Sequence, residues 1–500
     1  MKRAAIALAV ASTLLAAACN GHAVLVSRRT GAGTQVAGTT TNQGSNGKVL
    51  SKGGKGSLNV GAANGSGGSG PGGDSKVGTA QAGQANCATN SNPDEGFTDS
   101  SLKFGTIIPL TGALRPLGEQ VERVMKVSVE AINNQTHIPG YDLNWGCPDR
   151  PGIYGRKLSV STFSLNANTP EEALAGMRRL VDVEHVFSVR DCYLESNLMG
   201  PATQYQNSQG VPGVWCFFSE MPYPALAQWN YAPGVDPLVI AAVHTAYLIK
   251  KLDRTHIGIL ADPSAKNNIV AVVRKVAAYL HHPIPTGCVV YKKAQEADNG
   301  ERSEIAKLRT CYGAQTPTDA VFFGDSLNGT FGPLEARDQG WTNVQFACET
   351  CWVTSLADLC GSACRGMITD CQALPCVPWA DPNKYPAAAA LNDTYKKYLS
   401  REAPDILTYG PAAITGGIAL WLAMTGPDLS RDAFAHTMGS LHNWDAGIGP
   451  ILNTGPTDHF GGASTWLIQF TGSKPWFDDL TGRFMTLDEL GVPRSVATHG

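Results

Sequence analysis

Charged residues are scarce in this chain. Asp, Glu, Lys and Arg together make up 16% of the 500 residues, the formal net charge is −3, and no block of basic residues occurs. Proteins that bind nucleic acids usually carry clustered Lys and Arg that neutralise phosphates. A nucleic-acid partner is therefore not expected.

Long apolar runs are missing after the first 18 residues. A helix that spans a membrane needs about 18 or more predominantly apolar residues in a row. We therefore expect the rest of the chain to be soluble.

Motifs for cofactors and catalysis are also missing. The sequence contains no GxxxxGK[ST] loop and no GxGxxG after a strand, which are the usual signs of nucleotide binding. His281 and His282 lack a third ligand at metal spacing, and GDSLNG at 324–329 is GxSxxG rather than the GxSxG of a nucleophile elbow. We expect no cofactor, no bound metal and no enzymatic activity, with an exported hydrolase as a remote alternative.

The N-terminus carries an export signal. Two basic residues precede an apolar run at 4–18, and small residues lead up to Cys19. The ending LLAAAC resembles a bacterial lipobox, in which the signal peptide 1–18 is removed and the cysteine is lipidated. Cys19 would then bind membrane lipid and hold the protein on the outer face of the cell membrane. An ordinary signal peptide cut nearby is the alternative.

The next segment, residues 19–97, is rich in small and polar residues, as in GAANGSGGSGPGGDSK. Such a composition offers few apolar side chains to bury, so we expect a disordered tether. A flexible coil of about 75 residues has an end-to-end distance of roughly 50 Å. That length would lift a folded domain clear of a membrane surface.

Thirteen cysteines occur, and setting Cys19 aside leaves twelve, an even number in an exported chain. Disulfides are the expected state of all twelve. Six of them lie in CETCWVTSLADLCGSACRGMITDCQALPC at 348–376, which has a single CxxC and no histidine. A zinc site usually needs two such pairs of reduced cysteines. We predict disulfides in this segment and leave open which of the fifteen possible pairings occurs.

Short apolar strands alternate with amphipathic helices through the remaining 400 or so residues. The helices include one near 119–133, one capped by Thr169 with Glu172 and Pro170, and one from 236 to about 251. This alternation predicts an α/β fold with parallel sheets covered on both faces, and the length suggests two lobes. The strand candidates are 104–110, 158–163, 185–189, 211–218, 256–261, 288–291, 320–324 and 344–348.

A series of motifs between residues 101 and 485 resembles one known family. The motifs are FGTIIPLTG at 104–112, EAIN at 130–133, GRKLSV at 155–160, TPEEA to RRLVD at 169–182, HIGILAD at 256–262, DAVFFG at 319–324, VQFACE at 344–349, TYGPAA at 408–413 and TDHFGG at 457–462. In this order they resemble the type I periplasmic binding proteins of the leucine/isoleucine/valine-binding kind. Members of that family are solute receptors for ABC importers.

The resemblance implies two Rossmann-like lobes hinged by three crossovers. Lobe 1 would comprise 98–230 and 351–440, lobe 2 would comprise 231–350 and 441–485, and 486–500 would be a C-terminal tail. Ligand would bind at the carboxyl ends of the strands, and the lobes would close over it by hinge bending. A monomer that meets an ABC permease in the membrane is the expected working form.

The resemblance also implies a ligand-binding site. Ser196 and Ser219 match hydroxyl positions that meet the carboxylate of an amino acid, assisted by a helix N-terminus. Glu349 matches the acidic side chain that meets the ammonium, and Ser326 stands where the family often has an aromatic residue. Phe217 could line an apolar pocket. The alternatives are an N-cap for Ser196, a surface turn for Ser219, a solvated loop for Glu349 and strand core for Phe217.

Cys19 aside, we expect the six cysteines outside 348–376 to pair with one another. Cys192 with Cys216 is the preferred pair in lobe 1 and Cys288 with Cys311 in lobe 2, which leaves Cys87 for Cys147. Because no aromatic occurs in ADPSAKNN at 261–268, the identity of the ligand stays open. The predicted function is an extracytoplasmic lipoprotein that captures a small polar, amino-acid-like solute for an ABC importer. A ligand sensor or cell-envelope scaffold with the same fold is the alternative.

Overall fold

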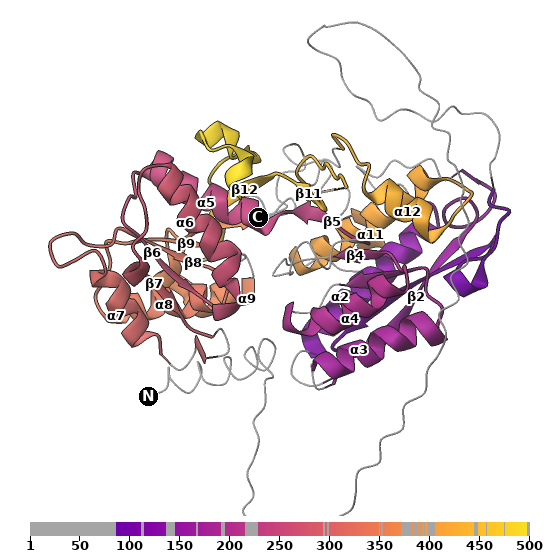
Figure 1. Ribbon diagram of the computed structural model, residues 1–500, viewed down its shortest axis with the longest axis horizontal. Helices are drawn as coiled ribbons and strands as arrows, with labels where there is room; N and C mark the ends of the chain where they lie inside the picture. Colours follow the sequence, from indigo (N-terminus) through magenta and orange to yellow (C-terminus); the bar gives the residue numbers. More distant parts are fainter. Residues whose placement is uncertain are drawn as a thin grey trace, which may run out of the picture. The chain divides into compact units, whose positions relative to one another are not determined.

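The computed structural model describes residues 87–497 with internal gaps. The gaps are 112–114, 137–145, 167–168, 192–195, 216–228, 294–295, 298–299, 350, 352–353, most of 372–405, 445–448, 457 and 475. The described residues form two α/β lobes, each built on its own sheet (Figure 1). Within these residues, no helix is both long and apolar enough to cross a membrane.

Lobe 1 is built on a six-stranded sheet with the order β11-β5-β4-β3-β1-β2, in which every neighbouring pair is parallel. A short η1 (Pro93–Glu95) precedes the first strand. The strands are β1 (Ser101–Ile108), β2 (Lys157–Ser164), β3 (Ser188–Asp191), β4 (Gly213–Trp215), β5 (Asn230–Val235) and β11 (Phe460–Gly462). The helices are α2 (Arg115–Asn133), α3 (Pro170–Arg178), η2 (Arg179–Val183), α4 (Ser196–Ser208), α11 (Ile406–Thr425) and α12 (Arg431–Met438).

Lobe 2 is built on an eight-stranded sheet with the order β13-β12-β10-β9-β8-β6-β7, and β14 pairs with β12. Only the pairs that involve β12 are antiparallel among the described strands. The strands are β6 (Ile257–Ala261), β7 (Val289–Tyr291), β8 (Ala320–Phe323), β9 (Gln345–Cys348), β10 (Ile368–Cys371), β12 (Ser464–Phe470), β13 (Phe477–Asp479) and β14 (Met485–Thr486). The helices are α5 (Pro237–Leu252), η3 (Pro263–Asn267), α6 (Ile269–Tyr279), η4 (Thr286–Cys288), α7 (Arg302–Thr310), α8 (Asn328–Asp338), α9 (Thr354–Cys360), η6 (Gly361–Cys364), η7 (Asp488–Leu490) and η8 (Arg494–Ala497).

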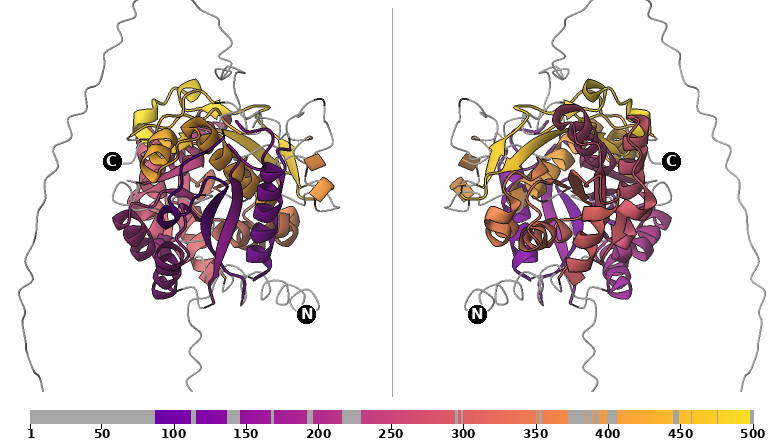
Figure 2. Two further views of the ribbon diagram at one scale, coloured as in Figure 1. Left: turned by 90° about the vertical axis from the view of Figure 1, so that its right-hand side faces the viewer. Right: turned by 90° about the vertical axis from the view of Figure 1, so that its left-hand side faces the viewer.

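The predicted fold class is confirmed: two mostly parallel sheets carry helices on their faces (Figures 1 and 2). Central strands such as β6 and β8 are buried along their whole length, as parallel strands covered on both faces should be. Helix α3 begins at the predicted cap, because Thr169 Oγ1 accepts a hydrogen bond from Glu172 N at 3.2 Å. Asp236 caps α5 in the same way through Leu238 N at 2.9 Å.

The strand pairs place the boundaries between the lobes at other residues than predicted. β5 pairs with β4, so the first crossover follows Val235 rather than residue 230. β10 pairs with β9, so the chain leaves lobe 2 after Cys371 and not at 351. β11 pairs with β5 in the lobe 1 sheet, so the third crossover lies between Gly462 and Ser464 instead of at 440. Strand pairing across the sheet decides these points, and sequence patterns give little sign of it in strands as short as β10 and β11, which have four and three residues.

The predicted C-terminal tail is part of lobe 2. Its turns η7 and η8 pack against α5 and α6. Leu487, Leu490 and Val492 are buried in the same apolar cluster as the helices. The segment 486–497 therefore completes the core of lobe 2 instead of extending from it.

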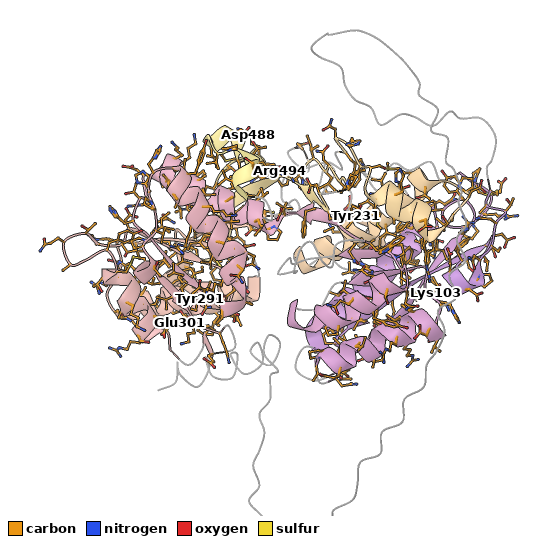
Figure 3. All side chains as sticks on the ribbon, viewed as in Figure 1. Lys103, Tyr231, Tyr291, Glu301, Asp488 and Arg494 are labelled. Carbon is orange, nitrogen blue, oxygen red and sulfur yellow. A yellow bond between two sulfur atoms is a disulfide. The ribbon has the colours of Figure 1, made fainter. Side chains whose placement is uncertain are left out.

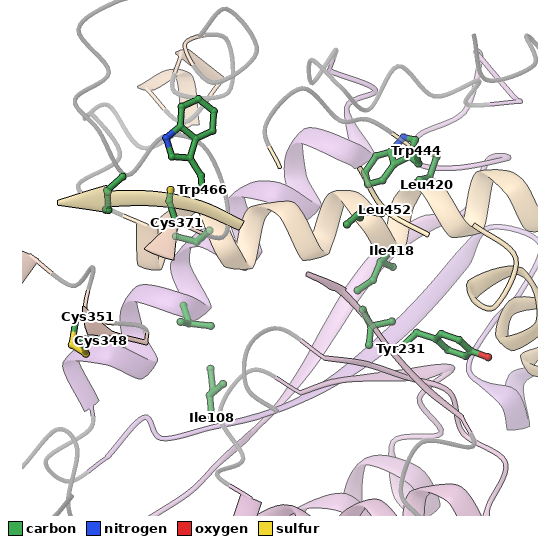
Figure 4. Close-up of a cluster of buried hydrophobic side chains, with 14 of the residues drawn as sticks. Ile108, Tyr231, Cys348, Cys351, Cys371, Ile418, Leu420, Trp444, Leu452 and Trp466 are labelled. Carbon is green, nitrogen blue, oxygen red and sulfur yellow. A yellow bond between two sulfur atoms is a disulfide. The ribbon is translucent and has the colours of Figure 1, made fainter. Parts of the chain in front are cut away.

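Four disulfides are described. Cys288 joins Cys311 and Cys87 joins Cys147, in agreement with the expected pairs. In the cysteine-rich segment, Cys348 joins Cys351 (Figure 4) and Cys360 joins Cys364. Cys371 is also disulfide-bonded. Cys192 and Cys216 lie outside the described residues. Because β9, α9 and η6 belong to lobe 2, the Cys348–Cys351 and Cys360–Cys364 bonds lie within that lobe.

Candidate functional site

Acidic side chains follow three neighbouring strands of lobe 2. Asp262 follows β6, Asp325 comes two residues after β8, and Glu349 follows β9. The three strands are parallel neighbours in the sheet, so their carboxyl ends meet at one edge. In open α/β sheets this edge is the usual place for a ligand.

Two of these carboxylates hold turns. Asp262 Oδ1 accepts from Ser264 N at 2.9 Å and from Ser264 Oγ at 2.7 Å. Asp325 accepts from the backbone N of Asn328 at 2.8 Å and from its Nδ2 at 2.6 Å. These bonds satisfy donors at the starts of η3 and α8, as capping side chains do. The GDSLNG stretch is thus the turn that connects β8 to α8.

Glu349 lies deeper than the other two. Its exposed fraction is 3%, and its backbone N donates to Phe323 O at 3.1 Å, which continues the β8–β9 ladder by one residue. A carboxylate buried this far is costly unless cations or hydrogen-bond donors surround it. Glu349, for which an ammonium contact is predicted, is thus a buried side chain at the carboxyl edge and does not lie in a solvated loop.

Ser326 lies next to the Glu349 segment. Phe323 and Cys348 are register partners on β8 and β9. Glu349 directly follows β9, and Ser326 comes three residues after the end of β8. The carbonyl oxygen of Ser326 lies 3.8 Å from Cys351 Sγ, and Ser326 itself is half-buried in the turn before α8. The structure therefore brings Ser326 and Glu349 together at one sheet edge.

The predicted residues of lobe 1 are described only in part. Ser196 is the first residue of α4, which follows the carboxyl end of β3. Phe217 and Ser219 lie outside the described residues. One residue at this edge was missed: β3 continues past the predicted end at Val189 into Arg190, which is only 2% exposed. The available signal was an arginine directly after the strand candidate 185–189.

Another buried acidic residue, Glu301, lies near β7 at one edge of the lobe 2 sheet (Figure 3). Glu301, which precedes α7, has an exposed fraction of 0%. Burial raises the pKa of its carboxyl group to about 10, with a further contribution from Asp325 and an opposing one from Lys292. A Cβ added at Gly332 of α8 would lie 3.0 Å from Glu301 Oε2, so the carboxyl group rests against that helix. It holds its proton at neutral pH and is sealed from solvent.

The TDHFGG motif lies where two crossovers leave lobe 1. His459 Nδ1 is 2.8 Å from Asn230 O and its ring stacks on Tyr231 with centroids 4.3 Å apart. Asp458 Oδ2 accepts from Arg494 Nη2 at 2.7 Å, and burial raises the pKa of the Asp458 carboxyl. These contacts tie β11 to β5 and to η8. His459 therefore contacts the amino end of β5, away from the carboxyl edge where Glu349 lies.

Metal binding finds no support in the part of the chain that the structure describes. No group of three or more His, Cys, Asp or Glu side chains there could hold a metal ion. The cysteines of the CxxC pair are joined to each other and are not available as thiolate ligands. The site offers carboxylates, hydroxyls and backbone groups, which suit a small polar organic ligand.

The fold has many solved counterparts. A possible leucine/isoleucine/valine-binding protein from Rhodopirellula baltica SH 1 matches with a TM-score of 0.59 and 16% identity, over 79% of this chain and 99% of that one. A fatty acid ABC transporter substrate-binding protein from Thermomonospora curvata matches with a TM-score of 0.61 and 16% identity, over 77% and 92%. A branched chain amino acid ABC transporter from Thermus thermophilus, with bound valine, matches with a TM-score of 0.60 and 12% identity, over 79% and 99%.

At these identities the solved structures show that the fold is shared. No curated protein matches the sequence. The family model described as "Periplasmic binding protein" matches residues 101–474, which is most of the chain and includes every described strand of both sheets except β13 and β14. This protein therefore belongs to the periplasmic binding protein family.

Proposed function

We propose that this protein is an extracytoplasmic solute receptor that captures an amino-acid-like solute between its lobes and delivers it to an ABC importer. Cys19 would carry the lipid that anchors it to the membrane. The observation that supports this proposal best is Glu349, a carboxylate buried at the carboxyl end of a central strand in a periplasmic binding protein. The protein performs no reaction in this role.

The chemistry of the edge favours a ligand with an ammonium group. A buried carboxylate and an ammonium form charge-assisted hydrogen bonds, which are roughly twice as strong as neutral ones. The ligand's carboxylate would meet Ser196 at the N-terminus of α4 together with Ser219, where the helix dipole favours an anion. Phe217 would line the apolar part of the pocket.

A fatty acid is the competing ligand class, because one solved counterpart is described as a fatty acid ABC transporter substrate-binding protein. A fatty acid carries a carboxylate and no ammonium. Placing it beside Glu349 would bury two like charges close together, which raises the free energy of the complex. Glu349 therefore supports the amino-acid class over the fatty-acid class.

Calorimetry with matched ligands tests the proposal. L-leucine carries both charged groups, 4-methylpentanoate lacks the ammonium, and 3-methylbutylamine lacks the carboxylate. We expect L-leucine or another L-amino acid to bind, the two partial ligands to bind far more weakly, and Glu349→Gln to weaken amino-acid binding at least about tenfold, a loss of about 1.4 kcal/mol.

A thermal-shift screen extends the test to other solutes. A ligand at about 100 times its dissociation constant adds about 2.7 kcal/mol to the stability of the native state. If decanoate or 4-methylpentanoate raises the melting temperature and no amino acid does, the amino-acid assignment is wrong. If no solute raises it, the receptor function itself is wrong and a scaffold role is favoured.

A further inference from the structure

The Cys348–Cys351 disulfide closes a loop of four residues around Glu349 (Figure 4). Both cysteines have an exposed fraction of 0%. The loop begins at the last residue of β9, so Glu349 is held between a strand end on one side and a covalent bond on the other. Its backbone can therefore rotate less freely than that of an ordinary residue after a strand.

Neighbouring elements hold this loop from three sides. Glu349 N donates to Phe323 O on β8 at 3.1 Å, and Cys351 N donates to Thr369 Oγ1 on β10 at 3.0 Å. On the third side the two sulfur atoms pack on Gly329 in the first turn of α8, where a Cβ would collide with both of them. The close approach explains why a glycine stands at that position.

This disulfide should add little to the overall stability of the protein. The stabilisation from a cross-link grows with the length of chain that it closes. Its cysteines are 3 residues apart, against 23 for Cys288–Cys311 and 60 for Cys87–Cys147. Its effect should therefore be local, on the few residues that it encloses and touches.

We infer that the Cys348–Cys351 disulfide is a positioning device that holds Glu349 in the geometry in which it binds the ligand's ammonium. The ligand in this inference is taken from the proposed function. The restraint on the loop follows from the disulfide and the contacts described above. Without the bond, the loop samples several conformations, and ligand binds only the fraction that is correctly arranged. If about one tenth of the molecules keep that arrangement, the apparent affinity falls tenfold.

The chain offers a matched control for this bond. Cys360–Cys364 has a sequence separation of 4, is also buried, and places Cys364 Sγ 3.8 Å from Gly329 O. It differs in that it does not enclose Glu349. Cys348→Ser with Cys351→Ser should therefore be compared with Cys360→Ser combined with Cys364→Ser, and the corresponding alanine pairs repeat the comparison without buried hydroxyls.

Hydrogen exchange measured by mass spectrometry, on the protein without ligand, tests the mechanics. Loss of the Cys348–Cys351 bond should speed exchange at residues 345–351 and in the first turn of α8, while loss of Cys360–Cys364 should leave residues 345–349 protected. Unchanged protection at 345–351 in both the serine and the alanine pair would overturn the inference, whatever the ligand is.

Calorimetry with L-leucine tests the consequence for binding. The Cys348/Cys351 pairs should bind about tenfold more weakly than wild type, and the control pairs should bind within a factor of two. Equal affinity in a variant with faster exchange would overturn the positioning role. If wild-type protein binds no amino acid at all, the proposed function is wrong, and so is the role of the disulfide in ligand binding. The hydrogen-exchange data would still show whether the disulfide restrains the loop around Glu349.

Gly329→Ala provides an independent test that keeps both cysteines. The added methyl group displaces the disulfide from α8, so L-leucine affinity should fall in this variant as well. Gly287→Ala is its control, because nothing lies within 4 Å of a Cβ at Gly287. Equal affinity of the two variants would contradict the proposed clamp.

Discussion

Replacing Glu301 with glutamine should stabilise this protein at neutral and alkaline pH. The Glu301 side chain has an exposed fraction of 0%, and neither carboxyl oxygen has a hydrogen-bond partner among the described residues. Burial, helped by Asp325, raises the pKa of the carboxyl group from 4.5 to about 10. Glutamine keeps the shape of the protonated acid and cannot ionise.

The size of the effect follows from proton linkage. Between pH 4.5 and about 10 the unfolded chain has lost this proton and the folded protein keeps it, so the free energy of unfolding falls as pH rises. The slope is about 1.36 kcal/mol per pH unit. At pH 7 the loss relative to acid pH is thus about 3 kcal/mol, and at pH 9 it is about 6 kcal/mol. The glutamine variant avoids this loss.

Urea denaturation at pH 5, 7 and 9 measures the effect. The variant should be within about 1 kcal/mol of wild type at pH 5 and should exceed it by about 3 kcal/mol at pH 7, with the larger gain at pH 9 and an unchanged urea dependence. Glu296→Gln is the control, because Glu296 is exposed in the same segment and its loss should change little. A difference between Glu301→Gln and wild type that does not grow with pH would refute the reasoning.

Two further predictions concern the core of lobe 2 and its cross-link. His244 in α5 is 1% exposed and donates from Nδ1 to Ile240 O at 3.0 Å, and burial lowers its pKa to about 4. Stability should therefore be lost as pH falls from 6.5 to about 4, by about 3 kcal/mol, and melting temperatures of His244→Leu should show a smaller loss over that range. Cys288→Ser with Cys311→Ser, which opens a separation of 23 residues, should cost about 3 kcal/mol in urea denaturation, whereas L-leucine affinity should stay near that of wild type.

The sequence predicts best where an element is long or fully buried. Strand 256–261 became β6 with all its residues buried, and the helix expected at 236–251 became α5 with its Asp236 cap. The second crossover was misplaced because β10 is four residues long and includes Thr369 and Asp370, which are both buried. Polar residues in a short segment between cysteines do not resemble a strand, and only pairing with β9 makes them one.

The same contrast applies to the site. Glu349 could be placed at the carboxyl edge because the strand that precedes it was recognisable, and its burial and its enclosing disulfide could not be foreseen. Among fifteen possible pairings, the choice of Cys348 with Cys351 depends on how the chain turns after β9. Arg190 was missed for a similar reason. Whether a charged side chain at the end of a strand is buried or exposed depends on the elements that pack around it.

Asp458 and His459 of the TDHFGG motif belong to the packing around β5 and β11, the strands that lead into two of the connections between the lobes. β5 and β11 pair in parallel at Phe460 and Ala232, and each strand leads within two residues into lobe 2. A Cβ added at Gly462 would lie 3.0 Å from Gly234 O, so the two connections run against each other. Stacking of His459 on Tyr231, with ring centroids 4.3 Å apart, adds a contact at the amino ends of the same two strands. The strands that lead into the two connections are therefore joined at both ends.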